Sequence, residues 1–178
     1  MRRLALLLAP LALLPAALHA ALPVGAKAAD FTTRGAMAGQ VVPVHLAALL
    51  KKGPVVLYFF PAAFTGGCNA EAHAFAEAIP QFRAAGATVI GMSADDVPTL
   101  QRFSSEKCAG AFTVASAGPA VVKAYDVSLG RQIQGRDVTK RTSYVIGRDG
   151  RVALVHDEMD PAKHVEQTLA AVQAMARR

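Results

Sequence analysis

Residues 55–82 read VVLYFFPAAFTGGCNAEAHAFAEAIPQF, and this stretch decides the fold class of the chain. Its beginning belongs to a continuous apolar, β-rich run at 54–60, which is typical of a strand buried on both faces. From Asn69 onward the apolar residues recur at helical spacing, which predicts a helix with one apolar face and a kink at Pro80. A buried strand followed by such a helix predicts a parallel or mixed sheet that helices cover.

The remainder of the chain alternates strands and helices in the same way. A helix is predicted at 95–110, with Asp95 or Asp96 as its N-cap and Gly110 as its stop, which places Cys108 in its last turn. The order of elements predicts an α/β domain over residues 22–178, with a thioredoxin-like three-layer fold in which helices flank a central mixed sheet. The other predicted elements are a hairpin around Gly35 and Gly39, a short helix at 45–52, strands at 87–94 and 110–116, a short helix at 119–127, a hairpin at 141–157 and a final helix at 160–178.

The first twenty residues, MRRLALLLAPLALLPAALHA, have the pattern of a secretory signal. A basic start with Arg2 and Arg3 precedes an apolar run, and small residues follow it. The run is interrupted by prolines and is shorter than the ~20 apolar residues of a spanning helix. We therefore interpret residues 1–20 as a signal peptide cleaved after Ala20 or Ala21, and we expect an exported, periplasmic protein without stable membrane association.

The composition excludes several classes of protein. With 178 residues, of which 53% are hydrophobic and 18% charged, the chain fits one globular domain rather than a disordered segment. Without the two arginines of the signal the net charge falls from +6 to about +4, which is too weak and dispersed to indicate nucleic-acid binding. The basic cluster at 130–141 is interpreted for the most part as a solvated loop.

Cys68 is one of two cysteines in the chain, and it stands at the start of the helix that follows the buried strand. Unpaired backbone N–H groups and the positive end of the helix dipole both favour the thiolate there, which is the reactive form. A lone cysteine is more often a small buried hydrophobe. Here, however, Pro61 and the pair Gly66-Gly67 predict a tight loop before the sulfur, and Thr65 offers a nearby hydroxyl. We therefore interpret Cys68 as a reactive thiol.

The helix start alone does not hold a thiolate at neutral pH. Bringing a free cysteine from its ordinary pKa of ~8.5 to ~6 takes ~3.4 kcal/mol. A helix terminus contributes ~0.3–1 kcal/mol, and rarely ~2 kcal/mol. A buried cation is therefore needed beside the sulfur, and arginine suits better than lysine because it stays protonated and presents several fixed donors.

The segment PAAFTGGC at 61–68 resembles the Pro-x-x-x-Thr-x-x-Cys motif of the peroxiredoxins, thioredoxin-fold enzymes that reduce hydrogen peroxide and organic hydroperoxides. The resemblance covers nearly all of the chain after the signal. KAADF at 27–31 is similar to the first segment of the family, and RTSYVIGRDGRV at 141–152 is similar to the strand that carries its essential arginine. In length and motif the chain most resembles the bacterioferritin-comigratory or peroxiredoxin Q type.

The resemblance implies a role for each residue of the motif. Cys68 would be the peroxidatic cysteine, whose thiolate attacks a peroxide oxygen and becomes a sulfenic acid. Pro61 would shield the sulfenate pocket from water, Thr65 would hydrogen-bond the peroxide, and Arg141 would hold thiolate and peroxide together. Gly66 departs from the family, which usually has proline there, and this loosens the loop without removing a catalytic group.

The resemblance implies that Cys108 completes the reaction. Members with a nearby resolving cysteine carry it five residues after the peroxidatic one, where this chain has His73, so short-range resolution is excluded. Other members place the resolving thiol on the helix after the next strand, which is where Cys108 lies. It would attack the sulfenic acid and leave a Cys68–Cys108 disulfide for an external dithiol, after local unwinding of the Cys68 helix. Two alternatives stay open, an unpaired Cys108 with a one-cysteine mechanism and a static structural bridge.

Other functions fit the sequence less well. A disulfide oxidoreductase of the same fold, the nearest alternative, would need Cys-x-x-Cys, and the second position is Glu71. A metallochaperone would need histidines at ligand spacing. The histidines of the domain lack that spacing and are interpreted as surface or packing residues: His45, His73, His156 and His164. We expect no metal or cofactor, a hydroperoxide substrate, a thioredoxin-like dithiol reductant, no nucleic-acid partner and a monomeric state.

Overall fold

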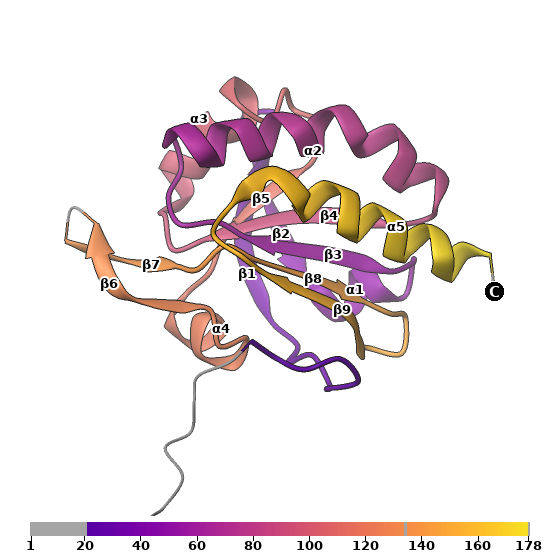
Figure 1. Cartoon of the computed structure of the whole chain (residues 1–178). Coiled ribbons are helices and arrows are strands. Elements are labelled where there is room, and N and C mark those ends of the chain that lie inside the picture. Colours follow the sequence, from indigo (N-terminus) through magenta and orange to yellow (C-terminus); the bar gives the residue numbers. More distant parts are fainter. Residues whose placement is uncertain (1–20, 134, 178) are drawn as a thin grey trace, which may run out of the picture.

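A computed structural model describes residues 21–133 and 135–177 of the protein (Figure 1). The expected signal peptide at 1–20 lies outside the described residues. The elements are β1 (Thr32–Met37), β2 (Gln40–His45), α1 (Leu46–Leu50), β3 (Val55–Phe59), α2 (Gly66–Ala84), β4 (Thr88–Ser93), α3 (Val97–Glu106), β5 (Thr113–Ser116), α4 (Pro119–Ala124), β6 (Ser128–Ile133), β7 (Arg136–Thr139), β8 (Thr142–Ile146), β9 (Val152–Asp157), a 3₁₀ turn (Pro161–Lys163) and α5 (His164–Ala176).

A seven-stranded mixed sheet with the order β2-β1-β5-β4-β3-β8-β9 forms the centre of the molecule. The three middle strands β3, β4 and β5 are parallel, and the outer pairs are antiparallel. Helices α2, α3 and α5 cover one face of the sheet, and α1 and α4 lie on the other (Figure 1). The predicted three-layer α/β fold is confirmed.

Strand β3 shows why the apolar run at 54–60 lies in the middle of the sheet. All five of its residues are buried. Because side chains alternate between the faces of a strand, Val56 and Tyr58 pack into the core under α2, whereas Val55, Leu57 and Phe59 pack into the core on the opposite face. The run serves two cores at once, as its continuous hydrophobicity predicted.

Helix α2 buries the predicted apolar face and begins at the cysteine loop. It starts at Gly66, with Thr65 at the N-cap position, and continues through Pro80 to Ala84. Cys68 lies in its first turn and is 1% exposed. The buried positions of the helix are Cys68, Glu71, Ala72, Phe75, Ala78, Ile79 and Phe82. One of these is a carboxylate, which bears directly on the chemistry of the site.

The predicted end of the helix at 95–110 was wrong, whereas its predicted start is confirmed. The helix predicted at 95–110 ends at Glu106, so Cys108 lies in the bend that follows α3 and not in its last turn. The physical reason is that Ala109 and Gly110 adopt φ angles of 49° and 65°, which a right-handed helix does not allow. At the other end Asp96 is the N-cap, because its side chain accepts from the backbone N–H of Thr99 at 2.8 Å.

The basic cluster at 130–141 is also more ordered than the predicted loop. Strands β6 and β7 form an antiparallel hairpin that extends from the body of the molecule (Figure 1). The side chains of Val138 and Thr139 at its base are buried, and the hydroxyl of Thr139 donates to the carbonyl of Phe60 at 2.8 Å. The hairpin thereby reaches the end of β3. The charged composition of the segment did not predict this buried contact.

Candidate active site

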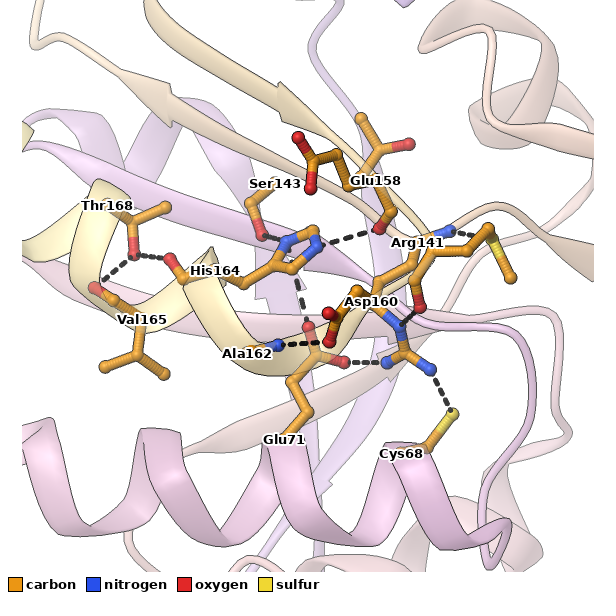
Figure 2. A network of polar contacts seen from close by, with 12 residues as sticks. Cys68, Glu71, Arg141, Ser143, Glu158, Asp160, Ala162, His164, Val165 and Thr168 are labelled. Atoms are coloured by element: carbon orange, nitrogen blue, oxygen red, sulfur yellow. Dashed lines mark hydrogen bonds and ion pairs between the residues drawn. The ribbon is translucent and has the colours of Figure 1, made fainter.

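The pairing of β3 with β8 brings the predicted arginine to the predicted cysteine. The strands are antiparallel, with Phe59 opposite Thr142, so Arg141 lies beside the end of β3. Helix α2 starts at the same end of β3 after the loop at 61–65. Arg141 and Cys68 are 73 positions apart in the sequence, yet a guanidinium Nη2 donates to the Cys68 Sγ at 3.6 Å (Figure 2).

Arg141 is held by three groups besides the sulfur. Its Nη1 pairs with the Oε2 of Glu71, its Nε donates to the carbonyl oxygen of Met159 at 2.9 Å, and its backbone N–H faces the Met159 sulfur at 3.4 Å. The residue is 5% exposed. Burial opposes its charge, but the negative charges of Glu71 and Cys68 outweigh this and raise its pKa above the ordinary value. A protonated arginine thus occupies the place where a buried cation was expected.

Glu71 balances this cation from the next turn of α2. Its side chain is fully buried, and burial raises the pKa of the carboxyl to about 7, although the charge and the hydrogen bond of Arg141 work in the opposite direction. Its second oxygen, Oε1, has no hydrogen-bond partner and lies 3.8 Å from the Nδ1 of His164 (Figure 2). Glu71 is therefore a carboxylate with one satisfied and one unsatisfied oxygen.

His164 at the start of α5 extends the cluster to the far side of the site (Figure 2). The imidazole is fully buried, its Nδ1 lies 2.8 Å from the hydroxyl of Ser143, and its Nε2 lies 2.9 Å from the carbonyl oxygen of Glu158. Burial lowers the pKa of His164 to about 4, so the ring is neutral at neutral pH. From the sequence, His164 was interpreted as a surface or packing residue. In the structure it is buried and belongs to a polar network.

Glu71 was missed as a functional residue because it entered the sequence argument only as the absence of a second cysteine. A signal was present in the sequence. Glu71 stands three residues after Cys68 and one before Ala72, inside the stripe that the periodicity assigns to the core. A carboxylate in such a stripe needs a partner, because an unpaired buried charge is very costly.

The loop between β3 and α2 is shaped by packing and by one aspartate. Phe64 has a φ of 65°, which is uncommon for a residue with a side chain, and its ring packs edge-on against Phe103. The backbone N–H of Ala63 donates to the carboxylate of Asp95 at 2.7 Å. Thr65 is exposed, and its hydroxyl donates back to a loop carbonyl at 3.0 Å. These contacts hold the loop against the end of the sheet.

A cavity of about 310 Å³ opens beside this loop. Of the predicted site residues, Pro61 and Thr65 line it, and Pro61 itself is buried. Residues of α3 and of the β6-β7 hairpin also line it, among them Arg102 and Val138. The cavity gives a small molecule a place next to the loop that leads to Cys68.

Cys108 differs from Cys68 in its surroundings. Both are free, buried thiols of the same core cluster, so no bridge joins them in this structure. The side chain of Cys108 is fully buried, and burial in its apolar surroundings raises its pKa to about 12. Cys108 is therefore held as a neutral thiol.

Of the other histidines of the domain, His156 packs edge-on against His164, whereas His45 and His73 have partners elsewhere. His45 pairs with Asp30 and His73 with Glu77, and both imidazoles are largely exposed. Within the described ranges 21–133 and 135–177, no group of three or more His, Cys, Asp or Glu residues is arranged to hold a metal ion. In the same part of the chain, no helix has both the length and the hydropathy needed to cross a bilayer.

Comparison with known proteins places the chain in one family. Residues 24–155 match the family model described as "AhpC/TSA family". The chain belongs to the AhpC/TSA family. The predicted resemblance to peroxiredoxins is confirmed by relatives that bear this name.

Two relatives of this AhpC/TSA protein illustrate the range of similarity. "Peroxiredoxin Q, chloroplastic" of Suaeda salsa is 35% identical over 128 residues, which are 70% of this chain and 58% of the relative. "Peroxiredoxin Q, chloroplastic" of Sedum lineare is 33% identical over 136 residues, which are 75% of this chain and 70% of the relative. The chain thus spans 58% of the length of the Suaeda protein and 70% of the Sedum protein.

Solved structures support the same placement of this AhpC/TSA protein. Peroxidoxin BcpB from Mycobacterium tuberculosis superposes with a TM-score of 0.76 at 32% identity, covering 85% of this chain and 97% of that one. Peroxiredoxin Q of Xanthomonas campestris superposes with a TM-score of 0.69 at 28% identity, covering 80% of this chain and 90% of that one. The shared fold therefore includes most of the described domain.

Proposed function

We propose that this protein is a thiol-dependent peroxidase that reduces hydrogen peroxide and organic hydroperoxides. The observation that carries the proposal is the contact between the guanidinium of Arg141 and the sulfur of Cys68 at the first turn of α2. The cation and the helix start both favour a thiolate at this position. The family supports the proposal, since a homologous structure from Xanthomonas campestris is described in terms of the alkyl peroxide reduction activity of that protein.

The proposed reaction begins with the Cys68 thiolate and a hydroperoxide that enters beside the loop. The sulfur forms a bond to one peroxide oxygen, the O–O bond breaks, and the electron pair leaves with the other oxygen, which takes a proton to become water or an alcohol. Arg141 stabilises the negative charge as it moves from sulfur to oxygen. Thr65 already donates its hydroxyl proton to a loop carbonyl, so its oxygen is free to accept a hydrogen bond from the peroxide.

The sulfenic acid at Cys68 is proposed to be resolved by Cys108. The Cys108 sulfur would attack the sulfenic sulfur, water would leave, and a thioredoxin-like dithiol would reduce the resulting disulfide. Because Cys108 is buried as a neutral thiol, the bend after α3 and the first turn of α2 would have to open. A Cβ built at Gly66 would meet nothing within 4 Å, so packing does not hold that end of the helix tightly.

The burial of Cys108 also favours a second candidate, a one-cysteine peroxidase in which an external thiol reduces the sulfenic acid directly. In that case Cys108 would serve as an apolar core residue. A disulfide oxidoreductase remains the less suitable alternative, because Glu71 and not a second cysteine stands three residues after Cys68.

The test is hydroperoxide consumption by the purified domain with a dithiol reductant. We expect turnover in the native protein and complete loss in Cys68→Ser. Equal turnover in Cys68→Ser would refute the peroxidase assignment. Cys108→Ser distinguishes the two mechanisms, because it should retain the first oxidation by peroxide but lose the intramolecular disulfide and the turnover that a dithiol drives. Unchanged dithiol-driven turnover would support the one-cysteine mechanism instead.

We further propose that the protein is exported to the periplasm, that residues 22–178 form its single domain, and that it acts as a monomer. The support for export is the sequence of residues 1–20 alone. Cell fractionation and N-terminal sequencing of the native protein test export, and size-exclusion chromatography with light scattering tests the monomer. A cytoplasmic protein with an intact Met1 would contradict the signal peptide.

A further inference from the structure

Behind Arg141 lies a buried polar network of Glu71, Ser143 and His164. Its hydrogen bonds leave one oxygen of Glu71 able to bind an added proton. The Nε2 of His164 faces the carbonyl oxygen of Glu158, and a carbonyl oxygen only accepts, so this nitrogen carries a hydrogen. In a neutral ring the Nδ1 is then an acceptor, and it accepts a hydrogen bond from the hydroxyl of Ser143. Nothing in this arrangement donates to the Oε1 of Glu71.

Glu71 Oε1 has no hydrogen-bond partner and lies 3.8 Å from His164 Nδ1, whose single lone pair already accepts from Ser143. Both side chains are fully buried, so an ionised Glu71 with an unpartnered oxygen is costly. One added proton would relieve this cost in either of two places. On Oε1 it makes Glu71 neutral, and on Nδ1, from where it would donate to the Ser143 oxygen, it makes His164 the cation of a buried ion pair with Glu71. Glu71 and His164 thus form a buried pair that is stabilised when it holds one added proton.

That proton changes the charge that Arg141 meets. Without it, one guanidinium faces two negative groups, the Glu71 carboxylate through Nη1 and the Cys68 thiolate through Nη2. With it, Glu71 and His164 are together neutral, and Arg141 has the thiolate as its single anion. Since opposite charges a few ångströms apart stabilise each other strongly in a buried site, the added proton favours the thiolate.

We propose that the Glu71–His164 pair holds one proton when Cys68 is a thiolate, and that His164 is thereby a positioning residue for the reactive sulfur although it does not touch it. At equilibrium the S–H bond of Cys68 breaks and the proton resides on Glu71 Oε1 or His164 Nδ1, with no change in oxidation state. This inference rests on the proposed role of Cys68 as the reactive thiol. It adds that a residue of α5 controls that role through Glu71 and Arg141.

The titratable and charged groups that face His164 come from several elements: Glu71 of α2, Arg141 before β8, His156 of β9 and Glu158 after β9. Glu71 and Cys68 also interact electrostatically with the buried phenol of Tyr58 on β3, whose hydroxyl has no hydrogen-bond partner.

His156 is not a neutral neighbour, because its ring packs edge-on against His164 with a centroid distance of 4.5 Å and its charge lowers the pKa of His164. His45, which pairs with Asp30 at an exposed position, is therefore the control. Burial raises the pKa of Glu71 to about 7 and lowers that of His164 to about 4, so the pair binds its proton at a pH well above the ordinary pKa of a carboxyl group.

The first experiment follows thiolate formation at Cys68 against pH, by ultraviolet absorbance and by the rate of alkylation with iodoacetamide, in a Cys108→Ala background. We expect His164→Gln, which keeps a donor toward Glu158 but binds no proton, to move the midpoint of thiolate formation upward by about one pH unit, a tenfold loss of thiolate below the midpoint. His45→Gln, at the exposed pair with Asp30, should titrate like the parent. Identical curves for both variants and the parent would overturn the proposal.

The second experiment keeps the pair intact and removes the sulfur instead. Coupling between two sites is reciprocal, so replacing the thiolate by a neutral group must weaken the proton held by the pair. In Cys68→Ser we expect the pair, followed by NMR of the His164 ring and the Glu71 carboxyl, to lose its proton about one pH unit lower than in the reduced Cys108→Ala protein. Identical titrations in the two proteins would refute the coupling.

Neither experiment uses peroxide, so the inference and the proposed function fail separately. A protein that shows the linked titrations but consumes no hydroperoxide would keep the proton pair and lose the peroxidase assignment. A protein that consumes hydroperoxide with unlinked titrations would do the reverse.

Discussion

The two sulfurs of this protein lie in one core cluster and yet have opposite environments. Cys68 lies beside a guanidinium, at a helix start, and next to a network of buried polar groups. Cys108 lies in the bend after α3 with apolar surroundings that raise its pKa to about 12. The difference shows that two equally buried cysteines can have opposite electrostatic environments, because the fold brings different charges and dipoles to each.

The largest effect is expected from removing the cation that distinguishes the two sulfurs. Arg141→Gln should lower the second-order rate of Cys68 with hydroperoxide by ~10²–10³-fold, because a buried charged donor to the developing anion is lost. Stopped-flow measurement of Cys68 oxidation provides the rate. Arg83→Gln, on the exposed side at the end of α2, should leave the rate unchanged. A loss smaller than tenfold in Arg141→Gln would show that the helix start suffices.

Folding of that variant needs its own control, because Arg141→Gln leaves Glu71 buried without its cation. The double variant Arg141→Gln with Glu71→Gln removes both charges together. We expect it to regain thermal stability without regaining activity. Recovery of the rate in the double variant would mean that misfolding, and not the missing cation, caused the loss.

Serine substitutions at Cys68 and at Cys108 should lower the free energy of unfolding by different amounts. In Cys108→Ser a hydroxyl replaces a fully buried thiol of the apolar core cluster, and the free energy of unfolding should fall by ~1–3 kcal/mol. In Cys68→Ser the hydroxyl can accept from Arg141, so the loss should be smaller. Urea unfolding under reducing conditions measures both values, with Cys108→Ala as the variant that adds no polar group. Equal losses of stability in the two serine variants would contradict the expected difference between the environments of Cys68 and Cys108.

The polar network should also show itself in the pH dependence of stability. The pKa of Glu71 is raised from 4.5 to about 7, so its contribution is present below pH 4.5 and is lost as pH rises to about 7. The pKa of His164 is lowered from 6.5 to about 4, so its contribution is present above pH 6.5 and is lost as pH falls to about 4. The two trends oppose each other in the native protein.

Single substitutions should therefore uncover one trend at a time. Relative to the native protein, Glu71→Gln should gain stability as pH rises from 4.5 to 7, and His164→Gln should gain it as pH falls from 6.5 to 4. Each change is at most tenfold in the folding equilibrium per pH unit. Denaturant unfolding across this range measures the slopes, and Cys108→Ala should run parallel to the native protein. Parallel curves for all variants would show that Glu71 and His164 titrate normally.

The smallest effect is expected at Gly67, where a Cβ would lie 3.3 Å from the Nη2 of Arg141. Gly67→Ala should displace the guanidinium by a few tenths of an ångström and lower the peroxide rate a few-fold. Stability should stay level or rise by up to ~1 kcal/mol, because alanine is the better helix former. Gly66→Ala is the matched control, since its Cβ would meet nothing within 4 Å. A slower rate in Gly66→Ala but not in Gly67→Ala would contradict the expectation that contact with the guanidinium causes the loss.

Much of this protein was determined by its sequence at short range. The continuous apolar run at 54–60 predicted a strand buried on both faces, and the periodicity after Asn69 predicted the buried face of α2. The spacing from Pro61 to Cys68 identified the family. These predictions succeeded because strand alternation, helix periodicity and the start of a helix depend on residues within a few positions of one another.

The tertiary structure decided everything that depends on distant pairing. Glu71 meets Arg141 from 70 positions away, and His164 meets Ser143 from 21, because β8 pairs with β3 and α5 packs beside α2. The sequence contained a carboxylate in an apolar stripe and a histidine in a final helix, but no local pattern states which partners satisfy them. Buried polar groups acquire their protonation and their role from partners that long-range packing supplies, and so the network behind the Cys68 sulfur appeared only in the folded chain.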